Sequence, residues 1–262
     1  MTGRLRPVGT GLGLVLALAL TGCAAGADET GAPVPTGVDL SRVDPDVPGN
    51  GLWYLSPEDA WRQVDAAVRD ARSATWSGRY VETADDAAFD QAADPAAGAP
   101  RTVDVTVSGT PAEHVATYAT AAGRVTIVTT DGRSYLRGDD AWATGVGLPE
   151  AATGSVCLPV GDPLVTTWEP LLSARDLLEA VVQPDRVELG IVAPVAGAPT
   201  VDLVLGPTAS PVGTLTVSAT GTPLPVRLVA ADDSGSGDFR FEGWGDPVDV
   251  AVPDDVVADC AG

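Results

Sequence analysis

The apolar residues of this chain alternate with polar ones over most of residues 75–244, and this period of two restricts the fold more than any other feature. The alternation is cleanest at Val103, Val105 and Val107, which are separated by Asp104 and Thr106. Such a pattern is typical of a strand with one buried face and one solvated face. Similar short segments, joined by turn signals, lie at 75–83, 101–109, 113–120, 124–130, 133–138, 186–192, 200–206, 213–220, 225–232 and 238–244. We therefore predict about ten strands in antiparallel meanders.

Two segments carry a helical period instead. In the first, Ser56 is a predicted N-cap and Pro57 occupies the first helical position. Its apolar stripe consists of Trp61, Val64, Val68 and Ala71. In the second, Ser173 caps a helix that ends before Pro184, and Pro170 divides the segment into two short pieces. Its apolar residues are Leu177, Leu178, Val181 and Val182. Together these elements predict an α+β fold, a large curved antiparallel sheet with helices on its concave face.

The N-terminus predicts export and lipid attachment. Arg4 and Arg6 precede an apolar run at 8–20, which is too short for a membrane helix because such a helix needs about 20 apolar residues. A basic region followed by an apolar run is typical of a secretory signal. The sequence Leu-Thr-Gly-Cys that ends at Cys23 resembles the lipobox of bacterial lipoproteins. We interpret residues 1–22 as a lipoprotein signal peptide and Cys23 as the lipidated residue; the alternative is a conventional signal in which Cys23 is incidental.

The rest of the chain is expected to form a tether and one domain. Residues 23–52 combine the lipidated cysteine with a stretch rich in Gly, Pro and Asp, a composition typical of a flexible linker. Residues 53–262 have the length of a single domain. We therefore predict a protein on the outer face of the cell membrane, extracytoplasmic and held there by its acyl chains.

The charge of the chain excludes one class of partner. The sequence has 15 basic and 36 acidic residues, a net charge of −21. Removal of residues 1–22 takes away Arg4 and Arg6, so that 13 − 36 gives −23 for the mature chain. Such a surface repels phosphates. We predict no nucleic acid partner, and we attribute attachment to the membrane to the acyl chains alone.

Two cysteines remain after Cys23 is assigned to the anchor. Outside the cytoplasm, Cys157 and Cys260 are expected to form a disulfide. The alternative is two independent buried thiols. The chain has one histidine and no closely spaced pair of cysteines, so we predict no metal site.

The usual signatures of catalysis are missing from the sequence. The single histidine, His114, is interpreted as a surface residue with no catalytic role. The sequence DSGSG at 233–237 departs from the nucleophile elbow at its first position, and the chain has no Walker or Rossmann glycine pattern. Asp44 and Asp46 only faintly resemble a calcium loop and are interpreted as part of a solvated linker. We predict no catalytic residue, no cofactor and no enzymatic activity.

Two segments resemble a known family. Residues 127–142 (IVTTDGRSYLRGDDAW) read as a strand, an Asp-Gly turn, a Tyr strand and a Trp hairpin. Residues 223–256 read as a penultimate strand, a loop and a Phe-x-x-Trp-Gly-x-Pro-Val pattern at 241–248. Both resemble the LppX/LprAFG family of actinobacterial lipoproteins. The resemblance implies a LolA/LolB-like half-barrel around an apolar cavity, and a carrier of acylated lipids or lipoglycans between the inner membrane and the outer envelope. Segment 157–173 is interpreted as an elaboration that covers or fills the cavity mouth.

Two functional hypotheses follow. In the first, acyl chains of a lipid or glycolipid enter between sheet and helices, and an envelope transporter is a further candidate partner. The candidate lining residues are Trp61, Val64, Val68, Val103, Val105, Val107, Val125, Ile127, Leu178 and Val182; the alternative for each is ordinary core packing. In the second hypothesis the core is filled, no lipid binds, and the anchored protein is a scaffold or sensor. An apolar void well above several hundred Å³ would favour the carrier.

Overall fold

The computed structural model describes residues 49–82, 101–183, 188–192, 199–207, 209–231, 235–258 and 260. All of them belong to one compact unit, Thr36–Gly262. The predicted signal peptide, Cys23 and almost all of the predicted tether lie outside the described residues.

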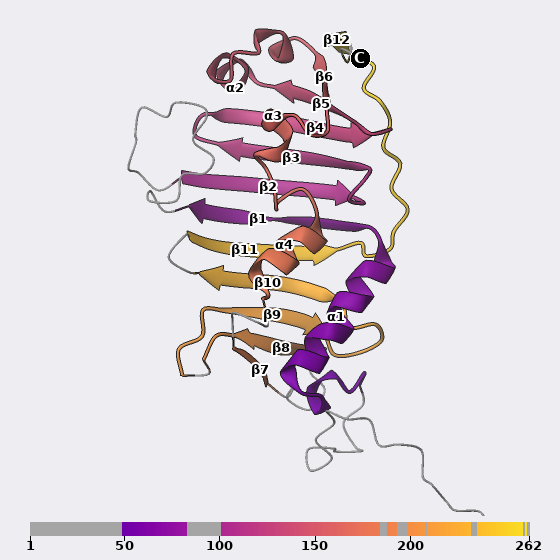
Figure 1. Ribbon diagram of the computed structural model, residues 1–262, viewed down its shortest axis with the longest axis vertical. Helices are drawn as coiled ribbons and strands as arrows, with labels where there is room; N and C mark the ends of the chain where they lie inside the picture. Colours follow the sequence, from indigo (N-terminus) through magenta and orange to yellow (C-terminus); the bar gives the residue numbers. More distant parts are fainter. Residues whose placement is uncertain are drawn as a thin grey trace, which may run out of the picture. The chain divides into compact units, whose positions relative to one another are not determined.

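A single sheet of twelve strands forms the body of this unit, in the order β12-β6-β5-β4-β3-β2-β1-β11-β10-β9-β8-β7 (Figure 1). The strands are β1 (Ala74–Glu82), β2 (Arg101–Gly109), β3 (His114–Thr120), β4 (Gly123–Thr130), β5 (Arg133–Gly138), β6 (Ser155–Pro159), β7 (Leu189–Val192), β8 (Thr200–Leu205), β9 (Gly213–Ser218), β10 (Pro225–Ala231), β11 (Gly235–Glu242) and β12 (Val256–Ala258). All neighbours are antiparallel except β12 and β6. The prediction of a large antiparallel sheet is confirmed, and the sheet is open, with β12 and β7 at its edges.

The strands lie where the alternation of the sequence predicts them. In β2, Val103, Val105 and Val107 are buried while Asp104 and Thr106 are exposed. The sequence analysis missed two strands, β6 and β12. Both are short, and β6 is buried along its first three residues, so neither shows the period of two. The pairing of β12 with β6 depends on contacts between distant parts of the chain, whereas β6 also pairs with the preceding strand β5.

Helices α1 (Pro57–Ala71), α3 (Pro163–Thr166) and α4 (Ala174–Val181) lie over one face of the sheet (Figure 1). The predicted caps are confirmed, because Ser56 accepts a hydrogen bond from the Asp59 amide and Ser173 accepts one from the Asp176 amide. The predicted break of the second segment is also confirmed, since α3 ends before Pro170 and α4 begins after it. Short 3-10 helices lie at Leu52–Tyr54 and Pro149–Ala152.

The prediction of a Trp hairpin at the end of segment 127–142 is wrong. Trp142 lies in a short helix, α2 (Asp140–Gly145), and Asp139 caps this helix by accepting a hydrogen bond of 2.9 Å from the Trp142 amide. The Asp-Asp pair at 139–140 thus begins a helix, because acidic residues near a helix N-terminus stabilise it.

The C-terminal segment runs from β11, an inner strand, to β12 at one edge of the sheet (Figure 1). The Thr130 hydroxyl donates a hydrogen bond of 3.4 Å to the Val250 carbonyl, and the Ser155 amide donates one of 2.9 Å to the Asp255 carbonyl. Asp255 also forms an ion pair with Arg137. Beyond β12, Cys260 is joined to Cys157 in β6 by a disulfide, with 4.6 Å between the Cα atoms. The predicted pairing of these cysteines is confirmed.

Candidate functional site

The candidate lining residues named from the sequence are all buried and all belong to one hydrophobic core cluster. Only Val68 of α1 and Val107 of β2 border the cavity described below. The others pack in the core around it, and their role as lipid contacts stays a prediction. They are Trp61, Val64, Val103, Val105, Val125, Ile127, Leu178 and Val182.

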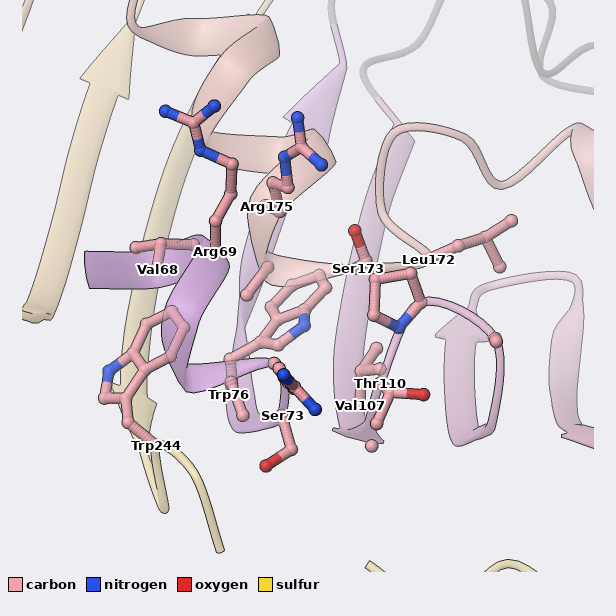
Figure 2. Close-up of a pocket in the computed structure, with 16 residues that line it drawn as sticks. Val68, Arg69, Ser73, Trp76, Val107, Thr110, Leu172, Ser173, Arg175 and Trp244 are labelled. Carbon is pink, nitrogen blue, oxygen red and sulfur yellow. The ribbon is translucent and has the colours of Figure 1, made fainter. Parts of the chain in front are cut away.

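A cavity of about 530 Å³ lies where α1 ends, β1 begins, β2 ends and α4 begins (Figure 2). This volume falls within the range of about 300–1,000 Å³ typical of small-molecule sites. Its lining residues are Val68, Arg69, Arg72, Ser73, Ala74, Trp76, Val107, Gly109, Thr110, Pro111, Ala112, Leu172, Ser173, Ala174, Arg175 and Trp244. The volume is not well above several hundred Å³, the size that would favour a carrier. The lining combines apolar and basic side chains.

The apolar part of the lining is fixed by an aromatic cluster. Trp76 packs edge-on against Phe239 with 5.7 Å between ring centroids, and it lies 6.3 Å from Phe241. Phe241 in turn stacks on Trp244, and the Trp244 indole N–H donates a hydrogen bond of 2.8 Å to the Pro225 carbonyl. Since each ring is held by the next, this part of the cavity is preformed.

Gly109 shapes the wall between β2 and β3. Its φ of 146° lies in a region that side chains rarely adopt, and a Cβ atom there would lie 2.3 Å from the Glu113 carbonyl oxygen. Glycine is therefore required for the chain to turn tightly into the loop of Thr110, Pro111 and Ala112 that borders the cavity.

Three arginines form the basic part of the lining. Arg69 forms an ion pair with Asp65 one helical turn earlier, and Arg175 pairs with Glu179 at 2.7 Å. Arg72, the residue that ends α1, has a left-handed backbone with φ of 65°. In the described part of the chain the structure pairs Arg72 with no acidic side chain.

The polar atoms that border the cavity differ in how they are satisfied. The Ser73 hydroxyl donates a hydrogen bond of 2.8 Å to the Asp246 carbonyl, and Ser173 is occupied as the cap of α4. By contrast, the Trp76 indole nitrogen has no hydrogen-bond partner among the described residues, although Trp76 is only 1% exposed. Leaving such a buried donor unpaired costs about 1–3 kcal/mol.

A second part of the same sheet face is filled by the chain itself. The Tyr118 ring of β3 stacks on Trp168 with 4.1 Å between centroids, and its hydroxyl donates a hydrogen bond of 2.8 Å to the Leu171 carbonyl. We call Tyr118, Trp168 and Leu171 the closed region. Burial raises the pKa of Tyr118, so its hydroxyl remains a neutral donor. Trp168 and Leu171, both from segment 157–173, therefore cover this part of the sheet.

The prediction that His114 lies on the surface is wrong. Its side chain is 3% exposed because His114 and Ala116 both face the core, while Val115 between them faces the solvent. Its Nδ1 lies 3.2 Å from the Thr110 carbonyl, and burial lowers the pKa of the imidazole below its ordinary value of 6.5. His114 therefore contacts the loop that borders the cavity, through Thr110, but is not itself among the lining residues.

Within the residues that the structure describes, no group of three or more His, Cys, Asp and Glu side chains is arranged to hold a metal ion. None of the helices that the structure describes has the length and hydrophobicity needed to cross a bilayer.

Solved structures similar to this one include the lipoprotein LppX of Mycobacterium tuberculosis, with 16% identity, 73% of this chain and 96% of that chain covered, and a TM-score of 0.41. They also include LprF of Mycobacterium bovis, with 15% identity, 76% and 98% covered, and a TM-score of 0.37. No protein-family model and no curated protein matches the sequence. We therefore take the function of this chain from its own geometry. Both similar structures are of LppX/LprAFG lipoproteins, the family that the sequence of this chain resembles.

Proposed function

We propose that this chain is a membrane-anchored, extracytoplasmic lipoprotein that binds an acylated lipid and helps to move it through the cell envelope. The observation that carries the proposal is the preformed cavity beside Trp76, which combines apolar walls with a basic rim. An acyl chain would lie against the apolar walls, and the polar head would remain at the rim.

Anchoring would depend on Cys23, which lies outside the described residues. The disulfide between Cys157 and Cys260 supports an extracytoplasmic location, because disulfides persist in oxidising compartments. The acyl chains on Cys23 would hold the domain near the bilayer from which it takes its lipid. An envelope transporter remains a candidate partner for delivery.

Binding of this kind requires no chemical step. Each Å² of apolar surface removed from water contributes about 25 cal/mol, so burial of the acyl chain favours binding without any energy input. Exchange is reversible, and its direction would follow the supply of lipid or the preference of a partner. The protein would therefore act as a carrier and not as an enzyme.

The test is native mass spectrometry of the Cys23→Ala protein after exposure to an envelope lipid extract. We expect acylated species bound at one per protein. Ala174→Phe places a ring in the cavity and should abolish binding, whereas Ala180→Phe, on the exposed side of the same helix, should not. Thermal unfolding of both variants checks that they fold. A protein that stays free of lipid in the extract would contradict the proposal.

A second candidate function is an anchored scaffold or sensor with a filled core. The closed region favours it, since Trp168 and Leu171 occupy space that a large lipid cavity would need. The acidic surface, with a net charge of −21, would then contact a cationic partner in the envelope. The same mass spectrum distinguishes the two candidates.

A further inference from the structure

We propose that the cavity selects amphiphiles with a negatively charged headgroup, with Arg72 as the principal contact and Arg69 and Arg175 as further cations of the lining. The inference rests on the proposed function and names the chemical class of its ligand, an acyl ester with an anionic head.

The charge around the cavity is opposite to that of the whole chain. The sequence has 36 acidic and 15 basic residues. Among the 16 residues that border the cavity, three are arginines and none is Asp or Glu. A general acidic surface repels anions, so a site that binds one must exclude carboxylates from its lining and supply its own cations. The cavity meets both requirements.

Arg72 is the arginine most available to a ligand. It is exposed, and no described carboxylate neutralises it. A guanidinium group presents several N–H donors in one plane, which match the oxygens of a phosphate or carboxylate. A charge-assisted pair with a ligand would therefore use donors that the protein itself leaves free.

Arg69 and Arg175 add two cations to the lining from different helices. Figure 2 shows the guanidinium group of Arg69, from α1, and that of Arg175, from α4, at the same end of the view. The described ion pair of Arg175 uses Nε, so its terminal nitrogens can donate to a ligand while Glu179 holds the side chain in place. The ion pairs with Asp65 and Glu179 hold these two side chains, which add two cations to the lining.

Trp76 explains why the ligand should be an ester and not a plain hydrocarbon chain. Trp76 borders the cavity, and its buried indole N–H has no acceptor among the described residues. A hydrocarbon chain against Trp76 would leave this donor unpaired, whereas an ester oxygen between the acyl chain and the head would accept its hydrogen bond. The ligand therefore needs an oxygen below its charged head.

The test compares three probes with the same acyl chain: lysophosphatidylglycerol (anionic), lysophosphatidylcholine (zwitterionic) and monoacylglycerol (neutral). Dissociation constants are measured by tryptophan fluorescence, below the critical micelle concentration, on the Cys23→Ala protein. We expect the anionic probe to bind about tenfold more tightly than the neutral one, the change that one charge-assisted hydrogen bond provides. The preference should shrink as salt rises from 0.05 to 0.5 M.

Two matched variants locate the preference. Arg72→Gln should remove most of it, while Arg79→Gln should leave it unchanged, since Arg79 is an exposed β1 residue outside the cavity lining and makes the same change in net charge. Trp76→Phe should weaken all three esters equally, because it removes a donor to the shared ester group. Inorganic phosphate alone should bind at least a hundredfold more weakly than the anionic lipid, because it lacks the acyl chain.

The outcomes separate this inference from the proposed function. Equal affinity for the three probes would overturn the headgroup preference and leave lipid binding intact. Equal losses in Arg72→Gln and Arg79→Gln would also overturn it, because the preference would then come from net charge. Tight binding of phosphate alone would replace the lipid with a free anion. No binding of any probe would contradict both the inference and the proposed function.

Discussion

The closed region and the cavity share one face of the sheet but use their aromatic residues differently. Tyr118 stacks on Trp168 and donates to the Leu171 carbonyl, so its ring and its hydroxyl are both satisfied by the chain. Trp76 is equally buried, yet its N–H has no partner among the described residues and its ring borders free volume. The Tyr118 donor is thus paired within the chain, whereas the Trp76 donor, on a residue that borders the cavity, has no described partner.

The first prediction removes the cover of the closed region. Trp168→Ala should lower the free energy of unfolding by about 3–5 kcal/mol, the usual cost of truncating a buried aromatic. Leu172 is half-buried and borders the cavity, so Leu172→Ala should lower the free energy of unfolding much less. Urea denaturation measures both. Similar losses would show that the two regions are packed alike, and the comparison would fail.

The second prediction tests a single hydrogen bond. Tyr118→Phe should lower the free energy of unfolding by about 1 kcal/mol, because it deletes the donor to the Leu171 carbonyl and little else. It should leave lipid affinity unchanged, whereas Trp76→Phe should weaken binding. Calorimetry and probe titration of the two variants give the comparison. A loss of affinity in Tyr118→Phe would mean that the closed region also takes part in binding.

The third and smallest effect concerns pH. Burial holds the pKa of His114 below 6.5, so the unfolded chain binds more protons than the folded one as the pH falls through 6.5. Stability from this group is therefore complete above about pH 6.5 and declines on acidification below it. Because His114 contacts the cavity loop at Thr110, ligand affinity should decline over the same interval.

The control for this prediction is His114→Gln, which cannot titrate. Its free energy of unfolding, measured by denaturation at pH 7.5, 6.5 and 5.5, should fall less steeply with acidification than that of the unmodified chain. Identical slopes for the two proteins would rule out His114 as the source of the pH dependence.

Much of the fold could be predicted from the sequence because its signals are local. Alternation at Val103, Val105 and Val107 fixes which face of β2 is buried, and the side chains of Ser56 and Ser173 cap their own helices. Of the missed strands, β12 is defined by its pairing with β6, about 100 residues away, which no local pattern shows. Strand β6 also pairs with the nearby β5, but its first three residues are all buried, so it lacks the alternation.

The cavity was predicted less well, for a related reason. Val68 and Val107 were named because they follow an apolar period, and both border it. Arg72, Arg175 and Trp76 carry no such signal, because they meet only when the end of α1 and the start of α4 pack over β1. Such sites at element termini require the tertiary structure.

The sheet order has a consequence for the order in which the chain folds. Strands β1 to β6 form one meander whose contacts are sequential, so they can pair as soon as they emerge. The aromatic partners of Trp76, Phe239 and Phe241, lie in β11, which pairs with β1 across more than 150 residues of sequence. Distant pairings form late because closing a long loop is slow. We therefore expect the cavity to be the last part of the domain to form, after the closed region has folded.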